Sequence, residues 1–214
     1  MSDYIENNHA VICGKIITDP TLSHEVYSER FYIFTLQVPR LSETCDNINV
    51  IISERLFSPE LELCEGEYVK ISGQFRSYNN YSGDGNRLVL TVFTKEIDSY
   101  SPESLENPNT VVLDGYICKT PTYRVTPFGR EIADVLIAVN RSYNKSDYIP
   151  LIAWGRNAKF CRDAPVGTRV RVTGRIQSRE YTKKLDEITN VTKTAYEVSV
   201  SKMEFFFDEE DDNE

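Results

Sequence analysis

The chain has 214 residues, of which 40% are hydrophobic and 27% are charged, and its net charge is −9. This composition is typical of a folded globular protein. No apolar stretch approaches the ~20 residues that a membrane-spanning helix needs. Five scattered cysteines and two histidines argue against a disulfide framework and against a zinc site. We therefore expect a cytoplasmic protein with no membrane partner, no metal and no other cofactor.

Most predicted elements are short strands, because apolar residues alternate with polar ones in runs bounded by Gly, Pro, Asn or Asp. In chain order, these runs cover residues 10–16, 31–38, 69–75, 88–93, 111–117, 132–139, 148–154, 170–176 and 196–200. The best helical candidates are residues 55–64 and 156–162. Each ends shortly before a glycine, Gly66 or Gly167, as helices commonly do.

The two halves of the chain are related by an internal repeat with a constant offset of 101 residues. The matched pairs include Gly14 with Gly115, Arg40 with Arg141, Asp46 with Asp147, and Ser77 with Ser178. A single register from Gly14 to Ser77 is hard to obtain by chance. Near the end we expect a slip of seven residues, which aligns Leu90 with Val198 and Val92 with Val200.

We therefore predict two copies of one domain, at residues 1–100 and 110–207, with a polar linker at 101–109 and an acidic tail at 208–214. Five strands with a helix between the third and fourth are the order of an OB-fold. The predicted fold class is all-β, with two tandem OB-fold five-stranded barrels, each with one short helix between strands 3 and 4. An SH3-like barrel is the alternative, but it lacks that helix.

The charges divide unevenly between the copies. Residues 1–100 carry 8 basic and 15 acidic side chains, whereas residues 107–207 carry 16 basic and 10 acidic ones. A basic domain is the usual footprint of a nucleic-acid binder, although a solvated mixed surface reaches the same +6. The second copy is therefore the candidate for nucleic-acid binding.

Aromatic side chains alternate with the cations of the second copy. Single-strand binders combine cations along the phosphates with rings that stack on bases, and each stacked base contributes about 1–3 kcal/mol. Tyr148 and Trp154 are six residues apart on one predicted strand, so both face the same side, and Leu151 and Ala153 face into the barrel. A lone Trp is more often part of a core; the pair of rings favours a platform. The candidate binding residues are Trp154, Tyr148, Tyr143, Tyr181, Arg156, Arg141, Arg175, Arg179, Lys183 and Lys184.

From about residue 109 to 205 the sequence resembles the bacterial single-stranded DNA-binding protein family. The motifs occur in the family's order: NTVVLDGYICKTP, AVNR, DYIPLIAWGRNA and VGTRVRVTGRIQSREY. The first copy matches only through the internal repeat. The resemblance implies an OB barrel and stacking roles for Trp154, Tyr148, Tyr143 and Tyr181, and it makes Arg156 a phosphate contact.

The resemblance also implies a function and partners. It implies largely sequence-independent binding and protection of single-stranded DNA in replication, recombination and repair, in association with the nucleoid. Relatives with two barrels per chain dimerise, so we expect a homodimer with four OB-folds. Family members dock replication or repair proteins on an acidic tip, and residues 208–214 are the corresponding candidate here. These acids could instead compete with DNA for the basic copy.

The first copy departs from the family pattern. Ser53 takes the place of Trp154, and Asn47 takes that of Tyr148. We therefore expect this acidic copy to serve mainly the interface between the barrels. A protein-interaction scaffold with weak or no DNA binding is the alternative function, since OB-folds host many functions. The sequence lacks GxxxxGK[ST], GxSxG and HExxH motifs, so we predict that the chain is not an enzyme.

Overall fold

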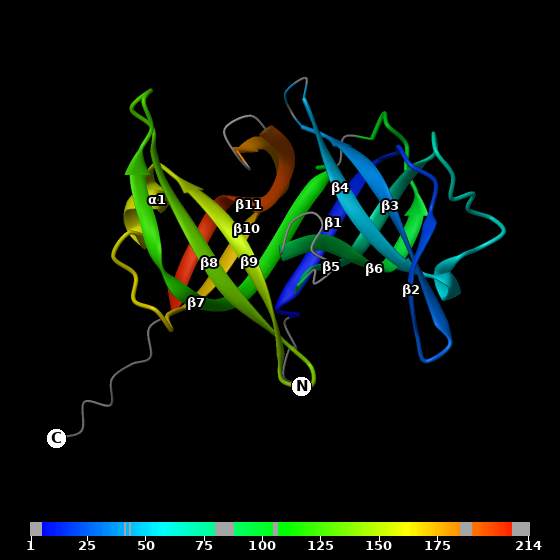
Figure 1. The fold of residues 1–214 in the computed structure, drawn as a ribbon, viewed down its shortest axis with the longest axis horizontal. Coiled ribbons are helices and arrows are strands. Elements are labelled where there is room, and N and C mark those ends of the chain that lie inside the picture. The colour runs from blue at the N-terminus through cyan, green and yellow to red at the C-terminus, as the bar shows by residue number, and fades with distance from the viewer. Residues whose placement is uncertain are drawn as a thin grey trace.

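The computed structural model describes residues 6–40, 42, 44–79, 88–104, 107–184 and 190–206, and in these ranges it is built almost entirely of strands (Figure 1). The first half contains β1 (Asn8–Ile16), β2 (Thr21–Val26), β3 (Glu29–Pro39), β4 (Cys45–Ser53), β5 (Tyr68–Asn79) and β6 (Leu88–Ser99). The second half contains β7 (Asn109–Val125), β8 (Glu131–Arg141), β9 (Lys145–Trp154), β10 (Arg169–Lys184) and β11 (Asn190–Phe206). Every predicted strand lies within one of these elements, so the all-β prediction is confirmed.

Each half closes into a barrel with the same pairing scheme. In the first barrel β1 pairs with β3 and β5, β5 with β6, and β3 with β4, and a parallel pairing of β4 with β6 closes the barrel. In the second barrel β7, β8, β9, β10 and β11 repeat this scheme, with a parallel pairing of β9 with β11. Gly73 and Gly174 lie at equivalent bulges of β5 and β10. A Cβ on either would lie within 2.3 Å of a carbonyl oxygen on the neighbouring strand, so the bulge requires glycine.

The prediction of a helix in both copies is right for the second and wrong for the first. Helix α1 spans Arg156–Cys161 and buries Ala158 and Cys161 against the second barrel. The first copy has only one 3-10 turn, η1 (Glu54–Leu56), which buries no residue. Pro59 and Glu60 occupy the positions equivalent to Phe160 and Cys161. A proline inside a helix removes a hydrogen bond, and a glutamate does not replace a buried thiol, so the helix does not form.

The predicted slip of the repeat near the end is also corrected. Val92 pairs with Val50, and Val198 pairs with Leu151, which is the equivalent of Val50. Val92 therefore corresponds to Val198, and the slip is five residues rather than seven. Alternation has a period of two, so an error of two residues keeps every side chain on its face and the pattern alone does not reveal it.

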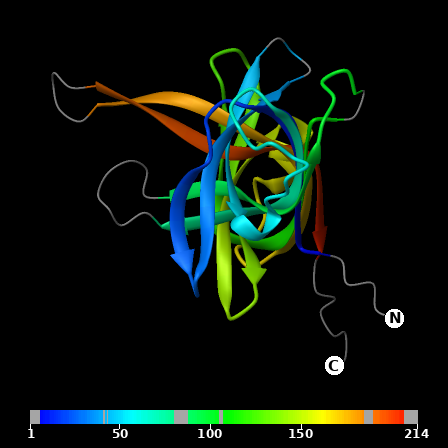
Figure 2. The ribbon, with the colours of Figure 1, turned by 90° about the vertical axis from the view of Figure 1, so that its right-hand side faces the viewer.

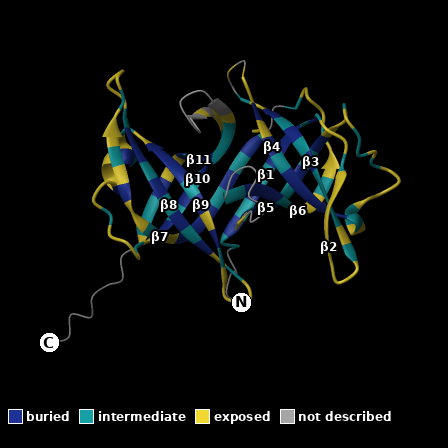
Figure 3. Cartoon of the chain, viewed as in Figure 1, coloured by how far each residue is buried: buried dark blue, intermediate teal, exposed yellow. Residues whose placement is uncertain are grey.

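The two barrels are joined through their first strands. β1 pairs antiparallel with β7, so that all eleven strands form one continuous sheet. Ala10 pairs with Val111, its own equivalent in the repeat, which places an approximate twofold axis at this pair. The buried core residues come from the strands of both barrels, and Figure 3 shows buried residues along these strands and exposed ones mainly at strand ends and in loops. The hairpins β5–β6 and β10–β11 project to the same side of the molecule (Figure 2). No helix in the described ranges is long and apolar enough to cross a membrane.

Candidate nucleic-acid interface

Strand β9 presents two aromatic rings on its outer face. Tyr148 is 49% exposed and Trp154 is 38% exposed, whereas Leu151 and Ala153 are buried in the barrel as the alternation predicted. The Trp154 indole lies beside Ile132 of β8, its cross-strand partner, and its Nε1 donates a hydrogen bond to Ser199 Oγ at 3.3 Å. The hydrogen bond fixes the edge of the indole. We call Tyr148 and Trp154 the β9 platform.

A glycine turn connects the β9 platform to a cation. Gly155 has φ of +52°, a conformation that residues with a Cβ rarely adopt, and its N–H donates to the carbonyl of Glu131. Helix α1 starts directly afterwards, which sets Arg156 next to the platform. Arg156 is exposed, and none of the described residues forms an ion pair or hydrogen bond with its guanidinium. It is therefore available to an anion in solution.

Tyr143 occupies the tip of the β8–β9 hairpin. Tyr143 and Asn144 both have positive φ, +63° and +53°, as a two-residue turn matching the strand twist requires. Asn tolerates this conformation, but a tyrosine in it is an outlier for its residue type. The ring is 94% exposed, so no packing within the described chain accounts for its presence. An exposed ring held at a hairpin tip is suited to stack on a flat ligand.

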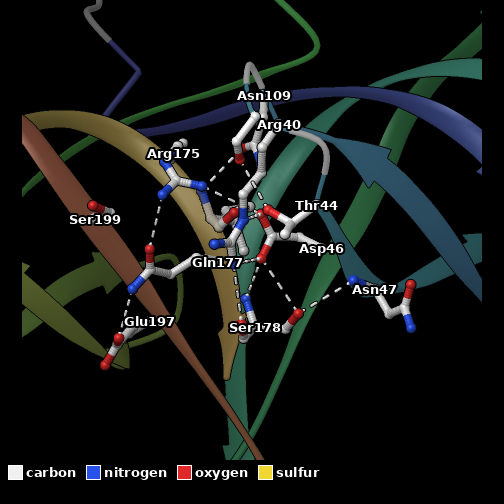
Figure 4. A network of polar contacts seen from close by, with 12 residues as sticks. Arg40, Thr44, Asp46, Asn47, Asn109, Arg175, Gln177, Ser178, Glu197 and Ser199 are labelled. Carbon is white, nitrogen blue, oxygen red and sulfur yellow. Dashed lines mark hydrogen bonds and ion pairs between the residues drawn. The ribbon is translucent and has the colours of Figure 1, made fainter. Parts of the chain in front are cut away.

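Two predicted cations, Arg175 and Arg141, belong to polar networks between the barrels. Asp46 of the first barrel is completely buried and accepts from the backbone N–H of Ser178 in the second barrel at 2.7 Å (Figure 4). Arg40 contacts both carboxylate oxygens of Asp46, at 2.8 and 2.6 Å. Arg175 approaches Asp46 Oδ2 at 3.4 Å and donates to Gln177. Arg175 is therefore partly neutralised.

The repeat produces the reciprocal network with the barrels exchanged. Asp147 of the second barrel is completely buried and accepts from the backbone N–H of Ser77 in the first barrel at 2.6 Å. Ser77 Oγ in turn accepts from the backbone N–H of Tyr148 at 2.7 Å, which anchors the start of the platform strand. Arg141 lies 3.4 Å from Asp147 Oδ2. Burial raises the pKa of Asp147 despite these partners.

The other predicted cations lie along β10. Arg179 is 58% exposed, and its Nε is 3.9 Å from the carboxylate of Glu197, which is buried and accepts a hydrogen bond from Gln177. The backbones of Tyr181, Lys183 and Lys184 pair with β11, but their side chains lie outside the described part of the structure. The acidic tail, residues 208–214, and Phe207 also lie outside the described residues.

A groove of about 950 Å³ runs between the barrels, and sequence reasoning missed it. Its basic lining residues are Arg76, Lys95, Arg141 and Lys145, and Tyr143 stands at its edge. Glu6 is the acid of this groove and is paired with Lys95. Burial, and then the like charge of Arg141, lower the pKa of Arg76, so the two guanidiniums repel each other where they face the groove. Because the lining comes from both barrels, one copy's charge pattern could not reveal it.

The chemistry of these surfaces is that of a binding site for a polyanion. In the described ranges, no group of three His, Cys, Asp or Glu side chains could hold a metal ion. Exposed rings, the unpaired guanidinium of Arg156 and a basic groove together suit a flexible polyanion with flat bases.

The barrels and their platform define the class of protein. Two five-stranded closed barrels of this connectivity are tandem OB-folds. The crystal structure of the wild-type single-stranded DNA binding protein from Thermus aquaticus has the same arrangement, with a TM-score of 0.72 at 17% identity, covering 97% of this chain and 96% of that one. The predicted fold class is confirmed, apart from the helix in the first copy.

The sequence comparisons are more specific. The sequence model of the single-strand binding protein family matches residues 108–206 of this chain. Single-stranded DNA-binding protein B of Bacillus subtilis is 36% identical over 83 residues, which cover 34% of this chain and 71% of that protein. The chain belongs to the single-strand binding protein family.

Two further similarities complete the comparison. The single-stranded DNA-binding protein of Enterococcus faecalis is 33% identical over 96 residues, 42% of this chain. The chain spans only about half of that relative's length, 51%. The dimeric N-terminal domain of the PriB protein from Thermoanaerobacter tencongensis is 46% identical, with a TM-score of 0.39, covering 45% of this chain and 99% of that one.

Proposed function

We propose that this protein binds and protects single-stranded DNA without catalysing a reaction and with little sequence preference. The observation that supports this most is the β9 platform: Tyr148 and Trp154 are exposed on one strand face and are followed by the unpaired Arg156. Bases of any sequence stack on such rings because every base has a π-face. The names of the relatives from Bacillus subtilis and Enterococcus faecalis agree with this proposal.

Each candidate residue has a role in this proposal. Trp154, Tyr148 and Tyr143 stack on bases, and Tyr181 stacks further along β10. Arg156, Arg179, Lys183 and Lys184 contact phosphates and release counterions, which makes the affinity fall with salt. Arg141 and Arg175 contribute less charge than the sequence suggested, because Asp147 and Asp46 lie beside them. The second barrel is the main binding domain.

The test uses the fluorescence of Trp154, which is the single tryptophan of the chain. Titration with oligo(dT) should quench this fluorescence, and raising the salt concentration should weaken the binding. Excitation at a wavelength that the indole absorbs and tyrosine does not keeps tyrosine emission out of the signal. Absence of both quenching and binding in a label-free assay would reject the proposal and favour a protein-interaction scaffold. Binding without quenching would retain the function and remove Trp154 from the site.

We propose the remaining features as parts of the same function. The protein forms a homodimer with four OB-folds, acts in the cytoplasm at the nucleoid in replication, recombination and repair, and is divided into domains at residues 1–100 and 110–207. The acidic residues 208–214 recruit replication or repair proteins. Analytical ultracentrifugation tests the dimer, and removal of residues 208–214 should abolish partner capture without reducing DNA affinity. A rise in DNA affinity on removal would instead support competition between the tail and DNA.

A further inference from the structure

The first barrel carries its own row of aromatic side chains on its outer surface. The rings of His24 on β2 and Phe31 on β3 are stacked, with centroids 4.9 Å apart and planes at 9°. Phe93 on β6 follows at 5.8 Å from Phe31. The guanidinium of Arg76 on β5 lies over the Phe93 ring, 3.8 Å from its centroid. We call these four side chains the first-barrel ladder.

The first-barrel ladder occupies the surface that corresponds to the Trp154 surface of the second barrel. Trp154 pairs across strands with Ile132, and in the first barrel Ser53 pairs with Phe31 in the same way. At this cross-strand pair the aromatic residue is on β9 in the second barrel, but on β3, the equivalent of β8, in the first. The expectation that the first copy serves mainly the interface rested on Ser53 and Asn47, which replace Trp154 and Tyr148, and Phe31 lies at neither position.

The neighbouring strand shows the same exchange. The corrected register makes Phe93 the equivalent of Ser199, which supports the Trp154 indole. The first barrel thus has rings at the two positions that flank Ser53, whereas the second barrel has one large ring in the middle. Ile51 is buried at this surface, as Ile152 is in the second barrel. The two surfaces therefore offer aromatic area at the same place on the fold through different residues.

The ladder is continuous with the basic groove between the barrels. Arg76, which covers Phe93, also lines that groove together with Arg141, Tyr143 and Lys145. A phosphate between Arg76 and Arg141 would relieve the repulsion of these two guanidiniums. The groove therefore joins the exposed Tyr143 of the second barrel to the rings of the first by a path lined with cations.

We propose that the first barrel is a second base-stacking site, which engages a nucleic-acid strand that has crossed the inter-barrel groove. Bases stack against His24, Phe31 and Phe93, and a phosphate lies between Arg76 and Arg141. This inference rests on the proposed function, because the same strand binds the β9 platform. It assigns the divergent acidic copy a direct part in binding, beyond its contacts with the other barrel.

The first test compares oligo(dT) of two lengths, using Trp154 as the reporter. One OB-fold covers roughly 4–16 nucleotides, so an oligomer of about 8 reaches only the platform and one of about 30 reaches both sites. The double substitution Phe31→Leu with Phe93→Leu removes both rings but keeps apolar side chains. We expect unchanged affinity for the short oligomer and about 5- to 150-fold weaker binding of the long one, the effect of one lost stack. Equal affinity of variant and wild type at both lengths would overturn the inference.

The second test moves the fluorescent reporter into the ladder. In the variant Phe31→Trp with Trp154→Phe, the long oligo(dT) should quench the new indole. Its control is Phe57→Trp with Trp154→Phe, because Phe57 packs on Tyr32, whose side chain leaves β3 on the side opposite to Phe31. Binding that quenches neither new indole refutes the ladder and leaves the proposed function intact. If wild-type Trp154 is not quenched and wild type does not bind, the proposed function itself fails.

Discussion

The two inter-barrel carboxylates provide a matched pair for measuring what holds the barrels together. Asp46 and Asp147 are equivalent in the repeat, both are completely buried, and each accepts a backbone hydrogen bond from a serine of the other barrel. They differ in their arginines. We therefore compare Asp46→Asn with Asp147→Asn, in which the carbonyl oxygen of each amide keeps the serine contact.

At Asp46 the substitution removes a well-formed ion pair. Arg40 makes two short hydrogen bonds to the carboxylate, at 2.8 and 2.6 Å, and an amide nitrogen would face the same guanidinium. Hydrogen bonds to a charged group are each worth about 1.5–3 kcal/mol. The Arg40 side chain is 27% exposed and recovers part of this from water. We expect Asp46→Asn to lower the free energy of unfolding by about 2–4 kcal/mol.

At Asp147 the corresponding loss is small. Arg141 approaches at 3.4 Å, and within the described structure Arg141 Nε and Asp147 Oδ2 make no hydrogen bond. Burial raises the pKa of Asp147, so its charged form is disfavoured, and replacing it by a neutral amide offsets the lost ion pair. We expect Asp147→Asn to lower the free energy of unfolding by less than Asp46→Asn does, because no hydrogen bond to a guanidinium is lost.

The measurement is urea unfolding of both variants and wild type at neutral pH and one fixed protein concentration, since any dimer makes stability depend on concentration. The slope of the free energy against urea must be unchanged for the midpoints to be compared. Equal losses for the two variants, or a larger loss for Asp147→Asn, would refute the reasoning from hydrogen-bond geometry.

Three further predictions follow from the same structure. Burial raises the pKa of Asp147, so the folded state binds this proton more tightly than the unfolded state does. Wild type should therefore gain stability relative to Asp147→Asn as the pH falls from neutral towards 3.8, the ordinary pKa of an aspartate. Urea midpoints measured across this pH range test the prediction. Arg156→Gln should weaken oligo(dT) binding and reduce the salt slope by about 1, whereas Arg162→Gln, whose guanidinium is paired with Asp163, should leave the slope unchanged in the same titrations. Gly73→Ala would set a Cβ 2.1 Å from the carbonyl oxygen of Phe93 and should cost roughly 1–3 kcal/mol or more in urea unfolding, against little for Ser72→Ala on the same strand.

The sequence was sufficient wherever the signal was local or repeated. Alternation located every predicted strand, and it set Tyr148 and Trp154 outside while Leu151 and Ala153 are inside. The sequence was insufficient where the pairing of strands decides which residues of the two copies are equivalent. A two-residue error at β6 leaves the faces unchanged, so the equivalence of Phe93 with Ser199 became visible only from the pairing of β4 with β6.

The contacts between the barrels illustrate the same limit. The repeat identified Asp46 and Asp147 as equivalent residues, but nothing local indicates that each meets a serine of the other copy. Arg141 and Arg175 were therefore predicted as nucleic-acid contacts, although each lies beside a buried carboxylate. Arg156, by contrast, is exposed and no distant segment of the described chain approaches it, so its assignment as a phosphate contact stays a prediction.

The approximate twofold axis through Ala10 and Val111 relates the contacts on the two sides of the barrel interface. On each side, a buried aspartate of one barrel accepts a hydrogen bond from a backbone N–H of the other. The two grooves beside the axis have diverged: the one lined by Arg76 and Arg141 measures about 950 Å³, whereas its counterpart beside Arg40 and Arg175 measures about 230 Å³. A nucleic-acid strand that passes between the barrels, as proposed above, would have more room in the groove lined by Arg76 and Arg141 than in its counterpart.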